Sequence, residues 1–220
     1  MANREPIEIG EYYHIYNRGV DKRLIIKDSK DADRFIKSLE FFNSKEPVLS
    51  LRDVLSDENY KNKKINDVLV QIVCYNLNPN HFHLILKEIN EGGISEFMKR
   101  VGGGYTWYFN NRNKRSGSLF QGRFKSVRIK SNEQLLHTSV YVNLNWKVHK
   151  ISGSAAVNVR SSWNEYMGKT FQNICKKNII LGQFNSIADY KDFAESSLGE
   201  IFKAGEDEND LEMLIGKHFF

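Results

Sequence analysis

The sequence predicts an α+β fold: a ferredoxin-like (split βαβ) antiparallel sheet with helices on one face, plus a C-terminal mostly helical extension. Within residues 1–150, strand-like and helix-like segments follow one another as strand, helix, strand, strand, helix, strand, helix. That order is the split βαβ arrangement with one further helix. After residue 150 the helical periodicity weakens, which indicates an extension that packs on this core.

The first strand is expected at residues 12–18, where aromatic and β-branched residues are dense and Gly19 ends the run. A helix follows because Phe35 and Leu39 recur at helical spacing after the cap candidate Asp28. These two elements open the predicted core.

A β-hairpin is predicted next. Residues 68–75 (VLVQIVCY) are almost continuously apolar, as expected of a strand that is covered on both faces. Residues 76–80 (NLNPN) have the composition of a turn, because Asn and Pro favour tight reversals of the chain. Residues 81–88 (HFHLILKE) then form the partner strand.

A second helix is predicted at residues 94–112, where apolar residues such as Phe97 and Val101 recur at helical intervals. Three glycines, 102–104, interrupt it at a cost of up to ~1 kcal/mol each relative to alanine. Close packing against the sheet is one explanation for these glycines. The close approach of DNA or another backbone is an equally good one. Both explanations stay open.

The last strand and helix of the core are expected at residues 118–130 and 132–147. We therefore divide the chain into a core domain, 1–150, and a C-terminal extension, 151–220, with an acidic tail at 205–212.

The composition is that of a globular protein, with 40% hydrophobic and 27% charged residues. No apolar run approaches the ~20 residues of a membrane-spanning helix, and the polar N-terminus resembles no signal peptide, so we expect no membrane partner. Cys74 and Cys175 have no metal-binding spacing, and a disulfide between them has no support in the sequence. A reducing cytoplasm fits these features.

The net charge of +5 is unevenly distributed, with seven basic residues and no acidic residue between residues 112 and 130. Such a stretch can neutralise the phosphates of nucleic acid, although a solvated face is the alternative. The candidates for phosphate contact are Arg18, Arg112, Lys114, Arg115, Arg123, Lys125 and Arg128. Tyr105, Trp107 and Tyr108 are candidates for stacking on bases, with core packing expected for at least one of them.

Two pairs of residues have the spacing of a catalytic site. His81 and His83 share one face of their strand, while Phe82 points to the other, so the two imidazoles can converge on one metal ion. Tyr141 and Asn145 are four residues apart and share one face of a helix. The alternatives are two unrelated histidines and a tyrosine of the core, and the spacing alone does not decide between them.

Five segments, in order along the chain, resemble the single-tyrosine transposases of the HUH superfamily, and in particular the REP-associated and insertion-sequence tyrosine transposases. Residues 78–86 (NPNHFHLIL) resemble the PNHxHLLL signature, in which the two histidines flank a hydrophobic residue. Residues 12–19 (YYHIYNRG) resemble YHVYNRG, residues 120–126 (FQGRFKS) resemble FQGRFKS, and residues 141–145 (YVNLN) resemble YIHLN. Residues 160–168 (RSSWNEYMG) are similar to the WSSYxxYLG element.

The sequence departs from this pattern at three positions. Trp146 follows Asn145, where the family has proline. Arg160 replaces a tryptophan and Trp163 replaces a tyrosine of the WSSY element. These changes concern the end of the catalytic helix and the docking of the extension.

The resemblance implies that residues 1–150 form the transposase catalytic domain, with Tyr141 as nucleophile and His81, His83 and Asn145 as ligands of Mg²⁺ or Mn²⁺. It implies cutting and rejoining of single-stranded or hairpin DNA through a 5′-phosphotyrosine intermediate, with a homodimer as one expected assembly. The implied location is the bacterial cytoplasm, at the nucleoid when bound to DNA.

Three alternatives stay open at this point. A ferredoxin-like module that only binds nucleic acid needs neither the histidine pair nor the Tyr/Asn pair. A metal-dependent nuclease that activates water would form no covalent adduct. A domesticated transposase would bind hairpins without mobilising DNA.

Overall fold

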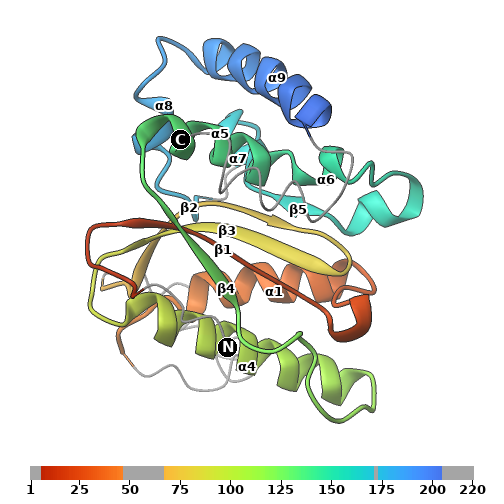
Figure 1. Cartoon of the computed structure of the whole chain (residues 1–220). Helices are drawn as coiled ribbons and strands as arrows, with labels where there is room; N and C mark the ends of the chain where they lie inside the picture. The colour runs from red at the N-terminus through yellow and green to blue at the C-terminus, as the bar shows by residue number, and fades with distance from the viewer. Residues whose placement is uncertain (1–5, 47–66, 171–172, 205–220) are drawn as a thin grey trace.

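The computed structural model describes residues 6–46, 67–170 and 173–204 (Figure 1). The acidic tail predicted at 205–212 lies outside the described residues. No helix of the described part of the chain is long and apolar enough to cross a membrane.

The described residues form one antiparallel sheet of five strands in the order β4-β1-β3-β2-β5. Its strands are β1 (Tyr12–Arg18), β2 (Val70–Leu77), β3 (His81–Glu88), β4 (Lys125–Ile129) and β5 (Arg160–Ser161). The first four have the ferredoxin-like order that the sequence predicts. The short strand β5 belongs to the C-terminal extension and pairs with the edge of β2.

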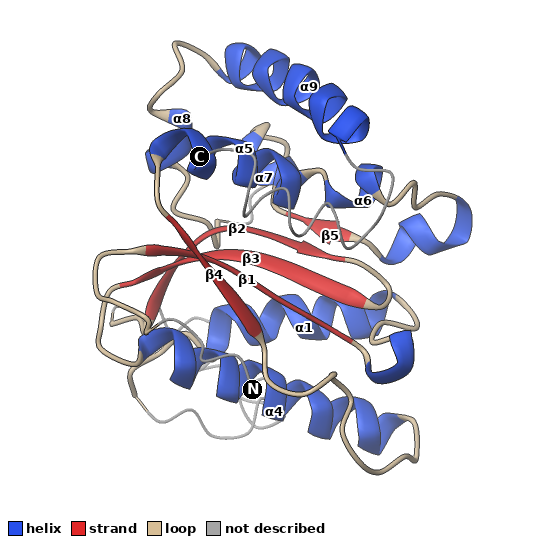
Figure 2. Cartoon of the chain, in the orientation of Figure 1, coloured by secondary structure: helices blue, strands red, loops and turns tan. Residues whose placement is uncertain are grey.

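Helices cover both faces of this sheet (Figures 1 and 2). The crossover helices α1 (Ser29–Phe41) and α4 (Gly93–Arg112) lie together on one face, as predicted. Helix α5 and the extension lie on the other face, which buries it as well. The remaining helices are η1 (Val20–Lys22), α5 (Asn132–Asn143), α6 (Asn145–Val148), η2 (Gly153–Asn158), α7 (Trp163–Tyr166), α8 (Asn178–Leu181) and α9 (Ile187–Ala204).

The strand predicted at 118–130 is wrong in its first half, because β4 begins only at Lys125. Gly122 has a φ of +74°, a left-handed turn conformation that ends regular pairing there. Before this turn, the backbone N–H of Gln121 donates to the carbonyl of Arg18 at 2.8 Å, and an isolated bridge joins Gly19 to Phe120. Arg123 therefore lies in a loop, and it does not share a strand face with Lys125.

The continuous helix predicted at 132–147 is also wrong. Helix α5 ends at Asn143, and Leu144 (φ −112°, ψ 15°) leaves the helical conformation before α6 begins at Asn145. Tyr141 and Asn145 are thus on two helices that meet at Leu144.

Helix α4 continues through its three glycines, and the structure separates their roles. A Cβ at Gly104 would lie 2.7 Å from the ring of Phe42, so close packing against the end of α1 explains this glycine. At Gly102 and Gly103 a Cβ would meet no atom of the described residues within 4 Å. Packing does not explain these two.

The extension docks on β2 through buried polar contacts. Ser162 accepts a hydrogen bond from the backbone N–H of Tyr75 at 2.9 Å. The buried carboxylate of Glu165 accepts from the Tyr75 hydroxyl at 3.1 Å and from the N–H of Cys175 at 3.1 Å. Arg160, which stands where the family has tryptophan, pairs with Asp33 on α1 at 2.9 Å. Polar pairing therefore ties the extension to the core.

Candidate active site

Strand β3 carries the histidine pair on the face that α5 covers. The ring centroids of His81 and His83 are 5.1 Å apart. Phe82 points to the opposite face, where it is buried against Phe35. The alternation that the sequence predicts is confirmed.

Asn145 meets the first histidine at the start of α6. Its Oδ1 lies 3.1 Å from Nε2 of His81, and Nδ2 of Asn78 lies 2.6 Å from the same oxygen. On the other side of the ring, Nδ1 of His81 lies 2.7 Å from Oδ1 of Asn80. The amide oxygen of Asn80 can only accept, and Nδ2 of Asn78, 2.8 Å from Nε2 of His81, can only donate, so Nδ1 of His81 carries the hydrogen and Nε2 presents its lone pair.

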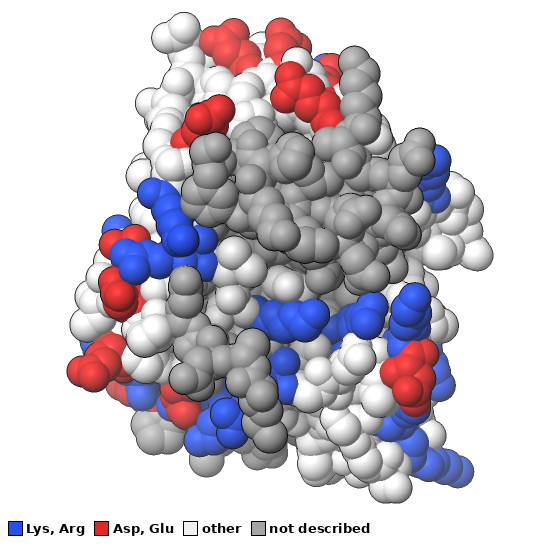
Figure 3. Space-filling view, in the orientation of Figure 1, with Lys and Arg blue, Asp and Glu red and all other residues white. Residues whose placement is uncertain are grey.

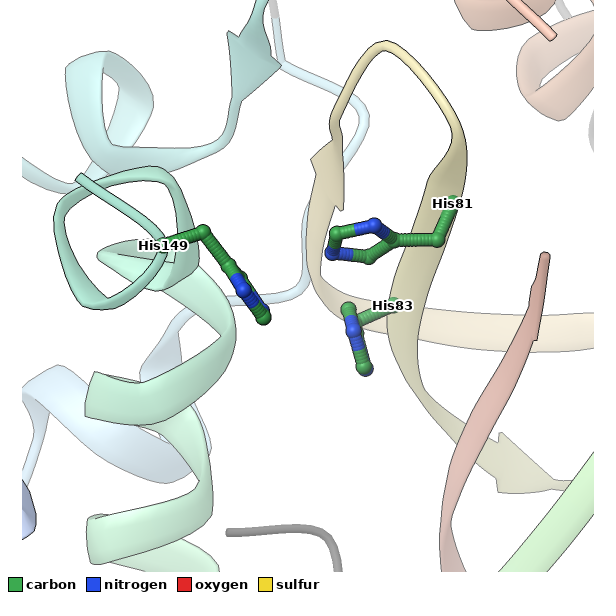
Figure 4. A group of neighbouring side chains, drawn as sticks. All are labelled: His81, His83 and His149. Carbon is green, nitrogen blue, oxygen red and sulfur yellow. The ribbon is translucent and has the colours of Figure 1, made fainter. Parts of the chain in front are cut away.

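A third histidine, which the sequence analysis did not select, completes the group. Ring nitrogens of His81, His83 and His149 all lie within 4.8 Å of one another. Figure 4 shows His149 reaching from the end of α6 toward the two rings on β3. The N–H of His149 donates to the carbonyl of Asn145 at 3.0 Å, one turn earlier in α6. The i, i+4 spacing used for Tyr141 and Asn145 was therefore available for this pair too.

A fourth histidine lies behind the group. His14 on β1 is buried, and its Nε2 lies 2.9 Å from Nδ1 of His83. One of the two rings must donate in this contact and the other accept. Strand pairing joins residues 69 positions apart here, so the local sequence pattern did not reveal the contact.

Tyr141 faces the same group from α5. Its ring is edge-on to His83 at 5.4 Å and to His14 at 5.9 Å, and its side chain is 1% exposed. It lines a pocket of about 60 Å³ together with His81, His83 and His149. The pocket brings the predicted nucleophile and the histidine cluster to one small opening.

Comparison with known proteins finds a family match in the central part of the chain. Residues 41–145 match the family described as "Transposase IS200 like". The matched segment runs through β2, β3, α4, β4 and α5 and ends at Asn145. It includes Tyr141 but neither His14 nor His149.

Among solved structures, a REP-associated tyrosine transposase bound to a REP hairpin is similar, with 14% identity and a TM-score of 0.46. The alignment covers 79% of this chain and 89% of that chain. A comparison with curated proteins found no match.

Burial keeps His14, His81 and His83 uncharged at neutral pH. It lowers the pKa of His14 to about 3 and is the main cause that lowers the pKa of His81 to about 4, with a smaller effect from His149. Burial also lowers the pKa of His83 well below its usual value. Neutral imidazole is the form that binds a metal ion.

The seven basic residues that the sequence selects as candidates for phosphate contact separate into groups. Arg18 and Lys125 line the Tyr141 pocket. Arg112 is held by Asp28 and the buried Asp31. Arg128 is held by Glu8 and Glu11. Arg115 donates hydrogen bonds to Asn110 and to the carbonyl of Ser118. Lys114 is exposed, and Arg123 lines a different groove. Figure 3 shows Lys and Arg side chains across the middle of the face that carries β1 and β4.

The aromatic candidates also separate. Tyr105 is fully buried and donates from its hydroxyl to the carbonyl of Ile25 at 2.7 Å, so it belongs to the core. The half-buried Tyr108 donates to Asp31 at 3.1 Å. Trp107 is 57% exposed. Of the three, Trp107 has the most surface to offer a base.

Proposed function

We propose that the chain is a transposase that cuts and rejoins single-stranded or hairpin DNA, with Tyr141 as its nucleophile. The observation that carries the proposal is the pocket in which Tyr141 meets three histidines, together with the cations of Arg18 and Lys125. The match of residues 41–145 to a transposase family supports DNA as the substrate. A module that only binds nucleic acid needs no such cluster beside a tyrosine.

The residues of the pocket fit a divalent cation. Nε2 of His81 and Oδ1 of Asn145 both accept from Nδ2 of Asn78, at 2.8 and 2.6 Å, and they lie 3.1 Å apart. Two acceptor atoms are thus held side by side, as ligands of one cation are. His81, His83, His149 and Asn145 would hold the ion, and His149 is an addition to the set implied by the resemblance.

A bound divalent ion would polarise a non-bridging phosphate oxygen and orient the scissile bond. Three imidazole nitrogens and one amide oxygen suit Mn²⁺ better than Mg²⁺, which prefers an all-oxygen shell. We therefore put Mn²⁺ first of the two candidate ions.

His14 acts as a positioning residue for His83. If Nδ1–H of His83 donates to Nε2 of His14, then Nε2 of His83 keeps its lone pair for the cluster. The opposite tautomer would place a hydrogen on the atom needed as ligand. The buried contact at 2.9 Å thus fixes the orientation of His83, and donation from His83 to His14 would fix its tautomer as well.

Tyr141 supplies the chemistry. Its phenolic oxygen attacks the phosphorus, the bond from phosphorus to the 3′ oxygen breaks, and a 5′-phosphotyrosine forms. The phenol gives up its proton and the leaving 3′ oxygen gains one, so no proton is lost overall. Attack of another 3′-OH on the phosphotyrosine reverses the step and releases Tyr141. Rejoining therefore needs no further energy source.

The pocket also favours a flexible substrate. Because Tyr141 is 1% exposed and the pocket is about 60 Å³, a phosphate group can approach but a stacked base pair cannot. Arg18 and Lys125 line the pocket and would hold the flanking phosphates. The exposed Lys114 and Arg123 would contact phosphates further along the DNA strand. A homodimer stays a prediction.

The metal set is tested by measuring cleavage of a hairpin-bearing single-stranded oligonucleotide while Mn²⁺ and Mg²⁺ are titrated separately. His81→Ala should abolish cleavage with both ions. His149→Ala should raise the Mn²⁺ concentration for half-maximal cleavage by roughly 10-fold or more, with a smaller change for Mg²⁺. His137→Gln, on α5 outside the cluster, is the control. An unchanged Mn²⁺ dependence in His149→Ala would remove His149 from the ligand set.

A further inference from the structure

A second hollow, of about 770 Å³, lies between helix α4 and the loop before β4. Gly102, Gly103 and Trp107 of α4 line one side, and Phe120 and Arg123 line the other. It lies on the α4 side of the sheet, whereas the Tyr141 pocket lies on the α5 side. We call this hollow the α4 groove.

The glycines in its wall have no role in packing. A Cβ at either Gly102 or Gly103 would meet no described atom within 4 Å, because both positions open into the α4 groove. Each glycine nevertheless lowers the stability of the helix by about 1 kcal/mol relative to alanine. What the two glycines provide is a bare stretch of helix that a flat ring can approach.

The rest of the lining has the chemistry of a single-strand binding site. Trp107 is 57% exposed, which leaves a large apolar ring in the wall of an open groove. The charged side chains among the described lining residues are Lys99 and Arg123, and no carboxylate is among them. Lys99 pairs with Glu96 at 3.3 Å, so Arg123 is the cation that remains for a phosphate, and an aromatic ring beside it fits the base.

The α4 groove adjoins the Tyr141 pocket at one residue. Asn17, near the end of β1, lines both of them, and its Nδ2 donates to the carbonyl of Gly122 at 3.2 Å. The same loop contributes Gln121 to the pocket and Gly122 and Arg123 to the groove. A strand held in the groove can therefore reach Tyr141 across Asn17.

We infer that the α4 groove binds an unpaired nucleotide of the DNA strand that leads to Tyr141. Its base stacks on Trp107 over the bare backbone of Gly102 and Gly103, and Arg123 contacts its phosphate. This inference rests on the proposed function for its substrate. It adds a site for the single-stranded flank of the hairpin, separate from the site of chemistry.

Fluorescence anisotropy tests the inference with labelled hairpin oligonucleotides of two kinds in the presence of a chelator. One kind is blunt. The other carries a single-stranded flank, on the 5′ side in one oligonucleotide and on the 3′ side in another. Trp107→Ala should weaken binding of one flanked hairpin by about tenfold and leave the blunt hairpin unchanged. Gly103→Leu should do the same, because its Cβ meets no described atom within 4 Å and the rest of the side chain extends into the groove.

Two controls separate this effect from folding. Gly199→Leu places the same side chain on α9, where a Cβ also meets no described atom within 4 Å, and should leave binding unchanged. Thermal unfolding should show that Gly103→Leu is at least as stable as the natural protein.

Three outcomes would overturn the inference. Trp107→Ala could leave both affinities unchanged, or it could weaken the blunt and flanked hairpins equally. It could also change the oligomeric state in light scattering, in which case a second copy occupies the groove. If the natural protein binds and cleaves the flanked hairpin, these results leave the proposed function intact. If it binds neither oligonucleotide, both proposals fall together.

Discussion

At the scale of single residues, the imidazole pair of His14 and His83 links the core of the sheet to the chemistry. Both rings are buried, and their nitrogens lie 2.9 Å apart. We expect His14→Ala to weaken Mn²⁺ binding by roughly 10–100-fold, the usual effect of removing a hydrogen-bond partner of a metal ligand. Calorimetric titration of Mn²⁺ measures this.

His14→Gln distinguishes positioning from packing, because the glutamine amide can still accept from Nδ1–H of His83. It should recover part of the Mn²⁺ affinity that His14→Ala loses. Equal affinities for the two variants would mean that His14 only fills space.

The buried histidines also predict a pH dependence of stability. Burial lowers the pKa of His14 to about 3 and that of His81 to about 4 in the folded state, against 6.5 in the unfolded state. As the pH falls below 6.5, the unfolded chain therefore binds protons that the folded chain refuses. The stabilisation of the folded state by these uncharged histidines is complete above pH 6.5 and is lost progressively as the pH falls toward about 4.

Urea unfolding in the presence of a chelator, from about pH 7 to about pH 4.5, measures this loss. His14→Gln should flatten the curve in this window, since it removes one of the groups. A curve that keeps its slope in the variant would contradict the assignment.

Local spacing singled out His81 with His83 and Tyr141 with Asn145, and the family resemblance implied that His81, His83 and Asn145 are ligands of one ion. The structure brings these three together. Neither argument predicted His14 or His149. His14 reaches the site through strand pairing across 69 residues, and His149 reaches it from the end of α6. Contacts of this kind depend on tertiary structure, which a pattern of neighbouring residues does not contain.

At the scale of elements, the ion pairs between α1 and α4 show why a basic stretch is not one surface. Arg112 at the end of α4 holds Asp28 and the fully buried Asp31 at the start of α1. Arg112 also lowers the pKa of Asp28 to about 2. This arginine therefore joins the two crossover helices.

Arg112→Ala should lower the free energy of unfolding by on the order of 2 kcal/mol, because it leaves the Asp31 carboxylate buried without its cation. The matched variant Lys125→Ala removes an exposed cation at the Tyr141 pocket, so it should change stability by less than about 0.5 kcal/mol. It should instead flatten the salt dependence of log K for single-stranded DNA by roughly 0.7. Binding in a salt series and urea unfolding measure the two effects. The reverse pattern would exchange the roles of the two residues.

The order of the elements was predictable because alternation and helical periodicity are local properties of the sequence. Their ends were less so. Strand β4 is shorter than its β-like composition suggests, because the turn at Gly122 interrupts the pairing with β1 between Gln121 and Lys125. The helix break at Leu144 has no glycine or proline to mark it in the sequence.

At the scale of the whole molecule, the site lies between two layers that come from distant parts of the chain. The sheet supplies His81 and His83, while α5 and α6 supply Tyr141, Asn145 and His149. The extension contacts both layers, since Ser162 accepts from Tyr75 on β2 and also donates to Asn143 on α5. We therefore propose that residues 151–204 hold the catalytic helix against the sheet, and that the division at residue 150 is not a boundary between independent units.

The account depends on Tyr141 as the nucleophile, and covalent attachment to DNA tests this most directly. The natural protein is incubated with a hairpin-bearing single-stranded oligonucleotide and Mn²⁺, separated on a denaturing gel, and digested so that mass spectrometry locates the DNA on the peptide. We expect an adduct on Tyr141 that Tyr141→Phe abolishes, while hairpin binding stays within a few-fold. Cleavage without an adduct, or an adduct that survives in Tyr141→Phe, would contradict the account.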